Sequence, residues 1–195
     1  MKLGRPKEFE RTDALQKAMK VFWANGYEGA SVCDLLEGMG INRGSMYDTF
    51  GDKRSLFLEA LGHYQNTVIE PLTQMICAPG SPLGNVRKTL CKVADAAGGS
   101  ECHGCLLTNT TVETAPHDAE VAKVMRASLR AIEDAFFDAL ERAIKNGELN
   151  RKAETRALAR FLTNALQGLV VTCKAKLGKQ TREDIIRVTM AALRQ

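Results

Sequence analysis

The sequence lacks the features that place a protein in a membrane or outside the cell. Of its 195 residues, 45% are hydrophobic and 26% are charged, as in ordinary folded globular proteins. No apolar run approaches the length of a membrane span, and no apolar segment of a secretion signal follows the basic start of the chain. We therefore expect a cytoplasmic protein that makes no contact with a membrane.

Histidine is scarce, and its three copies form no known catalytic pattern. His63, His103 and His117 do not fall into a Ser-His-Asp, Cys-His or H-E-x-x-H arrangement. His103 and Cys105 lie close in sequence, but two residues on one loop seldom point at each other. We therefore expect no enzyme activity.

The cysteines also lack the spacing of a disulfide framework or a zinc site. A C-x-x-C pair with His103 inside it is present, but structural zinc needs about four ligands and no second pair completes the set. We expect reduced thiols, no bound metal and no cofactor. The six cysteines are Cys33, Cys77, Cys91, Cys102, Cys105 and Cys173.

Apolar residues recur at helical spacing along nearly the whole chain, and no segment alternates for long with a period of two. This pattern predicts an all-α protein of about nine helices. Three short helices would form a domain over residues 1–52, and a larger helical domain would span residues 53–195. The expected helices cover residues 12–25, 31–38, 42–50, 53–77, 83–97, 105–113, 118–146, 151–177 and 181 to the end.

Residues that commonly cap helices stand at several of these expected starts. The pairs formed by Ser31 with Asp34 and by Thr181 with Asp184 both have the spacing of a capping box. Asn42, Asp52 and Asp118 each precede an apolar helical pattern.

The two short helices within residues 31–50 predict a helix-turn-helix. Its second helix must be short and must begin with small polar residues so that its backbone can approach the major groove. Arg43 can reach a guanine edge or a phosphate, Gly44 permits close approach, and Ser45 can hydrogen-bond to either. The alternative is a purely structural three-helix module that binds no DNA.

The remaining residues of this second helix divide into two faces. Met46 and Phe50 are four residues apart and are expected in the core, which leaves Tyr47 and Thr49 exposed beside the DNA face.

The segment GASVCDLLEGMGINRGSMYDTFGDK, residues 29–53, resembles the signature of the TetR family of regulators. In that signature a Thr or Ser opens one helix, a Gly-Val-Ser turn leads to a Lys-Gly-Thr-Leu-Tyr-x-x-Phe helix, and a Lys begins the next. The resemblance covers about 40 positions including Phe22, Gly26 and Tyr27, while the rest of the chain matches only in helix number and punctuation.

The resemblance implies DNA contacts at particular residues. Asp48 departs from the family, which often has His there, and would either contact a cytosine amino group or pair with Arg43 or Arg54. The implied targets are DNA phosphates, the major groove and, for a basic N-terminal arm, the minor groove. The implied residues are Arg5, Lys7, Ser31, Asn42, Arg43, Gly44, Ser45, Tyr47 and Lys53.

By the same resemblance the protein is a repressor that leaves a palindromic operator when a small-molecule effector binds. The eighth and ninth expected helices, residues 151–177 and 181 to the end, would join those of a partner in a four-helix bundle, giving a homodimer. Their apolar stripe includes Leu158, Phe161, Leu166 and Val170, with Ile185 and Met190 on the last helix.

The resemblance places an effector cavity among the helices between residues 53 and 146. The sequence Gly104-Cys105-Leu106, at the start of the expected helix 105–113, resembles a branch of the family in which the cysteine at this place reacts with electrophiles. A position at a helix N-terminus, with His103 or Lys92 nearby, favours the thiolate form of such a cysteine. An electrophile- or redox-sensing repressor and a ligand-independent architectural DNA-binding protein are therefore the alternatives. Candidate cavity residues are Tyr64, Met75, Cys105, Leu106, Asn109, Glu113, Met125, Phe136 and Phe137.

Overall fold

The structure is a computed structural model that describes residues 9–96 and 103–193. Every regular element in these two ranges is helical, which confirms the all-α prediction. The π-helix η1 joins α4 to α5 without a break, so the described residues form about nine separate helical rods, as expected. The elements are α1 (Arg11–Gly29), α2 (Val32–Met39), α3 (Arg43–Phe50), α4 (Lys53–Tyr64), η1 (Gln65–Ile69), α5 (Glu70–Ile76), α6 (Pro82–Ala96), α7 (Leu106–Glu113), α8 (Ala119–Lys145), α9 (Thr155–Lys174) and α10 (Lys179–Ala192).

The first three helices pack around the start of α4. Phe22 of α1 is fully buried, and its ring centroid lies 4.9 Å from that of Phe57 on α4. Gly26 has a φ of 78° and kinks α1, after which a further helical turn runs to Gly29. The predicted stop at Gly26 is therefore a kink, because glycine adopts this backbone conformation without strain.

The predicted caps of the early helices are confirmed. Asp34 N donates to Ser31 Oγ at 3.1 Å while Ser31 N donates to the Asp34 carboxylate at 2.8 Å, which completes a capping box. Asn42 caps α3 by accepting from Ser45 N at 2.8 Å. Asp52 and Asp118 cap α4 and α8 in the same way.

The predicted cap of the last helix at Thr181 is wrong. Gly178, with a φ of 89°, turns the chain earlier, so α10 begins at Lys179. The Thr181 hydroxyl therefore lies inside the helix and donates to the Leu177 carbonyl, and Asp184 bonds Arg187 instead.

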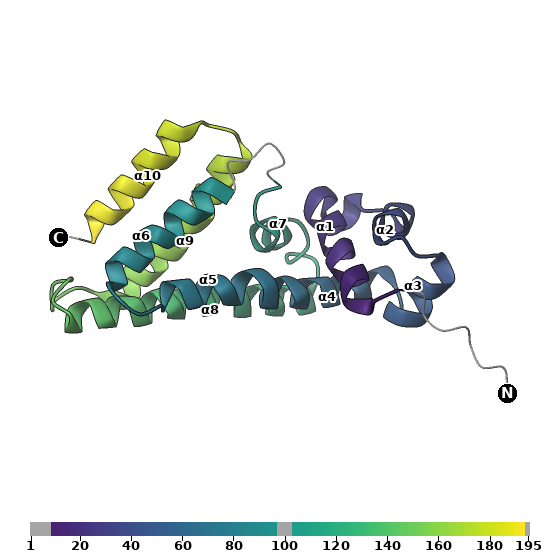
Figure 1. Ribbon diagram of the computed structural model, residues 1–195, viewed down its shortest axis with the longest axis horizontal. Helices are drawn as coiled ribbons and strands as arrows, with labels where there is room; N and C mark the ends of the chain where they lie inside the picture. The colour runs from purple at the N-terminus through teal and green to yellow at the C-terminus, as the bar shows by residue number, and fades with distance from the viewer. Residues whose placement is uncertain (1–8, 97–102, 194–195) are drawn as a thin grey trace.

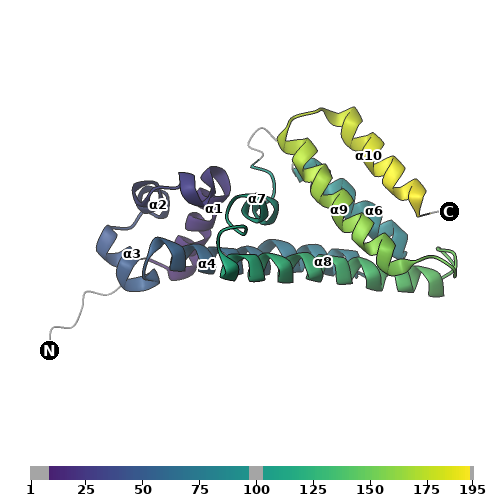
Figure 2. The same ribbon diagram turned by 180° about the vertical axis from the view of Figure 1, so that it is seen from behind.

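The long rod α4–η1–α5 runs beside α8, and both extend from the N-terminal helices toward the far end of the molecule (Figures 1 and 2). They run in the same direction, because Arg54 near the start of α4 bonds Asp118 before α8, and Arg142 late in α8 bonds the Ala78 carbonyl beyond α5. Helices α6 and α9 cross this pair, and α7 lies between them and α1 (Figure 1).

The rod changes register at η1 because of Pro71. Proline has no N–H to donate to the carbonyl four residues earlier, and its ring crowds that turn. A local π-helical turn accommodates this residue at the beginning of α5. The rod that joins the two ends of the molecule is thus interrupted at its middle.

Candidate functional site

Helix α3 presents a polar face to solvent and an apolar face to the core. Met46 is fully buried and Phe50 is 3% exposed, whereas Tyr47 is 44% exposed. Arg43 and Gly44 at the first turn are also exposed, and Ser45 is half-buried. The start of α3 therefore offers one cationic and one hydrogen-bonding side chain, Arg43 and Ser45, beside a glycine.

Gly44 leaves the surface of α3 open for close approach. A Cβ atom at this position would meet only the Asn42 Oδ1 atom, at 3.3 Å. Asn42 is exposed, but its side-chain oxygen is already used as the cap of α3. Its remaining amide N–H groups are the part that can reach a bound molecule.

Two expectations for α3 need correction. Thr49 is not exposed, because it is half-buried and its hydroxyl oxygen faces the interior. The alternative pair between Asp48 and Arg54 is not formed, because the Arg54 guanidinium binds Asp118 and Glu120, both at 2.8 Å. Asp48 remains exposed on the same surface as Tyr47.

The predicted phosphate-contacting residues flank α3. Ser31 is exposed at the start of α2. Lys53 is the first residue of α4, and its Nζ atom lies 4.5 Å above the ring of Tyr27, so the side chain is held across α1. Arg5 and Lys7 lie outside the described residues.

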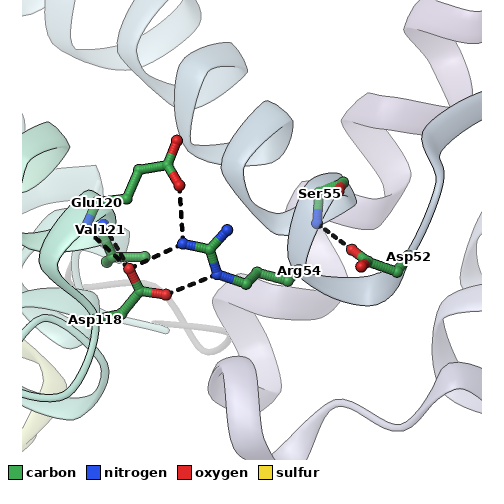
Figure 3. Close-up of polar contacts among 6 residues, drawn as sticks. All are labelled: Asp52, Arg54, Ser55, Asp118, Glu120 and Val121. Atoms are coloured by element: carbon green, nitrogen blue, oxygen red, sulfur yellow. Dashed lines mark hydrogen bonds and ion pairs between the residues drawn. The ribbon is translucent and has the colours of Figure 1, made fainter.

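Arg54 links the start of α4 to the start of α8 (Figure 3). Asp118 accepts from Arg54 Nε at 2.8 Å and also caps α8 through Glu120 N and Val121 N. The Arg54 guanidinium and the Val121 N–H lower the pKa of Asp118 from 3.8 to about 2. This exposed cluster joins the helix-turn-helix end of the molecule to the larger helical domain.

A cavity of about 430 Å³ lies between α1, the α4–η1–α5 rod, α6, α8 and α9. Most of its wall is apolar, and Tyr64 and Cys105 are the predicted ligand residues that line it. The complete lining is Lys20, Trp23, Tyr64, Val68, Ile69, Leu72, Val93, Ala96, His103, Gly104, Cys105, Ile132, Leu166, Gln167 and Val170.

Polar groups of three residues that line the cavity bond residues within 104–108. The Tyr64 hydroxyl lies 3.3 Å from Cys105 Sγ, and burial together with Cys105 raises the pKa of Tyr64 well above its usual value. The Trp23 indole N–H donates to the Gly104 carbonyl at 3.1 Å. Gln167 lines the cavity and hydrogen-bonds Thr108.

Five predicted ligand residues do not line this cavity. Phe136 is buried in the core, and the guanidinium carbon of Arg156 lies 3.9 Å above the Phe137 ring. Asn109 bonds the His103 carbonyl and Lys174, and Glu113 bonds the backbone of α1. Met75 is half-buried away from the cavity. Of the further candidates, Leu106 and Met125 are both buried core residues.

The cavity walls supplied by α1, α6 and α9 were not predicted from the sequence. Trp23, Leu166 and Val170 come from helices expected to have other roles, and Val93 of α6 lies within residues 53–146 but was not among the candidates. Helical spacing shows that such residues are apolar, but it cannot tell a packed core from the wall of a cavity.

The predicted dimerisation stripe on α9 divides into two faces. Leu162, Leu166 and Leu169 are buried within the protein, and Leu166 also lines the cavity. A different set of apolar side chains is exposed on α9, α10 and the turn between them. This set is Phe161 (41% exposed), Val171 (53%), Leu177 (59%) and Val188 (55%).

Within residues 9–96 and 103–193, no three His, Cys, Asp or Glu side chains gather as metal ligands would. The same ranges contain no helix with the length and apolar character needed to cross a membrane. Among the described residues, Cys33, Cys77, Cys91 and Cys105 are free thiols.

An exposed short helix α3, set by α1 and α2 at one end of a helical domain with an apolar cavity, defines a helix-turn-helix DNA-binding protein. Residues 14–60 match the N-terminal family described as bacterial regulatory proteins, tetR family. Residues 90–189 match the tetracyclin repressor-like C-terminal domain.

Relatives and solved structures agree with these matches. The chain is 35% identical to the uncharacterized HTH-type transcriptional regulator YezE of Bacillus subtilis, over 98% of this chain and 100% of YezE. It is 28% identical to the HTH-type transcriptional repressor ComR of Escherichia coli, over 88% and 82% of the two chains. A cysteine mutant of the regulator CifR, solved with 26-bp operator DNA, has a TM-score of 0.84 and 33% identity, covering 97% of this chain and 98% of CifR.

The chain belongs to the TetR family of bacterial transcriptional regulators. The resemblance noted in the sequence is thereby confirmed. Members of this family are DNA-binding regulators and not enzymes.

Proposed function

We propose that this chain is a cytoplasmic homodimeric repressor that binds a palindromic operator and leaves it when an apolar small molecule enters the cavity. One observation carries the proposal, which is that an exposed recognition helix and an apolar cavity are joined by the single rod α4–η1–α5. The family match supports it, as do the repressor ComR and the CifR structure with operator DNA.

The DNA contacts follow from the exposed surface of α3 and its flanks. Arg43, Gly44 and Ser45 enter the major groove, with Asn42 beside them, because they form the first turn of α3, where Arg43 and Gly44 are exposed and Ser45 is half-buried. The residues proposed for phosphates are Ser31, Tyr47 and Lys53, and those proposed for the minor groove are Arg5 and Lys7.

The dimer forms through α9 and α10. Side chains of Phe161, Val171 and Val188 expose apolar surface there, and a palindromic operator needs two recognition helices related by a two-fold axis. Leu166, which the sequence placed in this stripe, is not part of the exposed surface because it is 3% exposed and lines the cavity.

The effector is a small, mainly apolar molecule with one hydrogen-bonding group. A cavity of about 430 Å³ falls within the range of small-molecule sites. Its apolar wall suits a ring or short chain, and the polar groups of Tyr64 and Gln167 in that wall suit a hydroxyl or carbonyl group.

Coupling to DNA passes along α4, which holds Lys53 at one end and Tyr64 at the other. A small displacement at the cavity changes the separation of the two recognition helices, which must stay about 34 to 36 Å apart. By linkage, an effector that weakens operator binding also binds more weakly to the DNA-bound dimer, by the same factor.

DNA binding is tested by selecting duplexes from a random pool with the purified dimer and titrating the selected operator. Arg43→Ala should cost about 1 to 3 kcal/mol and relax sequence preference at one position in each half-site. Lys53→Ala should weaken binding to all duplexes and lower the salt dependence by about one ion per subunit. Arg126→Ala, on the exposed side of α8, is the control, and unchanged operator affinity in both test variants would contradict the docking.

Effector binding is tested through Trp23, the sole tryptophan, which lines the cavity. Titration with 1-octanol and 2-naphthol should change its fluorescence and release the operator. Val93→Phe narrows the cavity and should reduce both responses. If no apolar compound changes either signal, the ligand-independent architectural function replaces the sensor.

A further inference from the structure

The kink at Gly26 creates a helix start inside α1. Backbone N–H groups just after such a break lack acceptors within the helix. Tyr27 and Glu28 are the two residues in this position, and α1 resumes its helical course through them to Gly29.

Glu113, the last residue of α7, supplies the missing acceptors. Its carboxylate accepts from Tyr27 N at 3.2 Å and from Glu28 N at 3.0 Å, across more than eighty residues of sequence. A Cβ atom on Gly26 would lie 2.7 Å from this carboxylate, so only glycine leaves room for the contact.

The other end of α7 is tied to α1 as well. The Trp23 indole N–H donates to the Gly104 carbonyl at 3.1 Å, two residues before α7 begins. Trp23 and Gly104 both line the cavity. Residues 104–113, here called the strut, are therefore bonded to α1 at both ends and line the cavity at one end, at Gly104 and Cys105.

We infer that Glu113 is a positioning residue for operator binding, which fixes the helix-turn-helix against the sensing domain through the strut. Helix α1 packs on α2 and α4, so a strut bonded to α1 contributes to the orientation of α3 in addition to the α4 rod. A molecule in the cavity touches the strut at Gly104 and Cys105, which gives the cavity a second route to the DNA-binding surface. This inference rests on the proposed function.

A palindromic operator and an isolated half-site place different requirements on the geometry of the recognition helices. A palindromic operator needs both at a fixed spacing, whereas an isolated half-site needs only one well-folded helix-turn-helix. Loss of the Glu113 bonds frees the orientation of each helix-turn-helix but leaves its own fold intact. Palindrome binding should therefore weaken while half-site binding does not.

The experiment compares Glu113→Ala, Glu113→Gln and the control Glu70→Gln, at an exposed position of α5, in the dimer of the full chain. Duplexes carrying the selected palindrome or one half-site are titrated at the same salt concentration. Glu113→Ala should weaken palindrome binding by about tenfold, within the usual range of coupling between sites. Glu113→Gln keeps one acceptor and should lie between Glu113→Ala and the wild type, while the control matches the wild type.

Trp23 emission without DNA gives a second, independent reading. Loosening the strut should shift the emission of Glu113→Ala to longer wavelength and increase its quenching by iodide. An unchanged palindrome affinity, or an equal loss on palindrome and half-site, would overturn the positioning role. A wild-type dimer that binds no selected duplex would refute the proposed function, and the Trp23 emission would then decide the strut alone.

Discussion

Val171→Asp places a charge on the exposed apolar face of α9. Val171 is 53% exposed, so about half of its side chain remains to be buried by a partner. Fully burying a valine contributes about 1.5 to 3 kcal/mol, so burying the exposed half of Val171 contributes about 1 kcal/mol per subunit. Two-fold symmetry doubles this loss, and each unpaired buried carboxylate adds several kcal/mol.

The total cost to the dimer is at least about 4 kcal/mol, which corresponds to a roughly thousandfold rise in the dissociation constant. Sedimentation of the variant over a concentration series should show a monomer where the wild type is a dimer. Val112→Asp is the matched control, because Val112 is 76% exposed on α7 and lies outside α9 and α10. If Val171→Asp sediments as an unperturbed dimer, the assignment of the interface to this face is wrong.

Two further predictions concern the link at α8 and the cavity thiol. The pKa of Asp118 is lowered to about 2, so its ion pair with Arg54 stabilises the fold above about pH 4 and is lost as the pH falls toward 2. The difference in urea midpoint between the wild type and Asp118→Asn, which keeps a capping residue, should therefore be constant near neutrality and shrink in acid. Cys105→Ser keeps a hydroxyl beside Tyr64, so an apolar effector should still release this variant from the operator. If N-ethylmaleimide releases the wild type from the operator but not Cys105→Ser, sensing is assigned to the thiol.

The contacts of Arg54 with Asp118 and of Glu113 with α1 differ in chemistry. Arg54 meets Asp118 through exposed charges, which salt screens. Glu113 meets backbone N–H groups of α1, so no side chain at Tyr27 or Glu28 is needed for the bond. We therefore expect salt to weaken the Arg54 link more than the strut.

The sequence alone determined the helix-turn-helix. A capping side chain bonds a backbone N–H about three residues later, so this interaction depends only on local sequence. Ser31, Asn42 and Asp52 therefore mark helix starts whatever the tertiary structure. The spacing of Met46 and Phe50 likewise assigned the buried face of α3, and the matching signature identified the family.

Only the tertiary structure decided which residues form the cavity, the strut and the free face of α9. Trp23, Val93 and Leu166 are far apart in sequence and meet because three helices cross there. In the sequence, nothing distinguishes Glu113 from other residues at helix ends. Its partners are backbone N–H groups of α1 that a kink leaves without acceptors in the helix. Helical periodicity records whether a side chain is apolar, whereas its neighbours across the core depend on how whole helices cross.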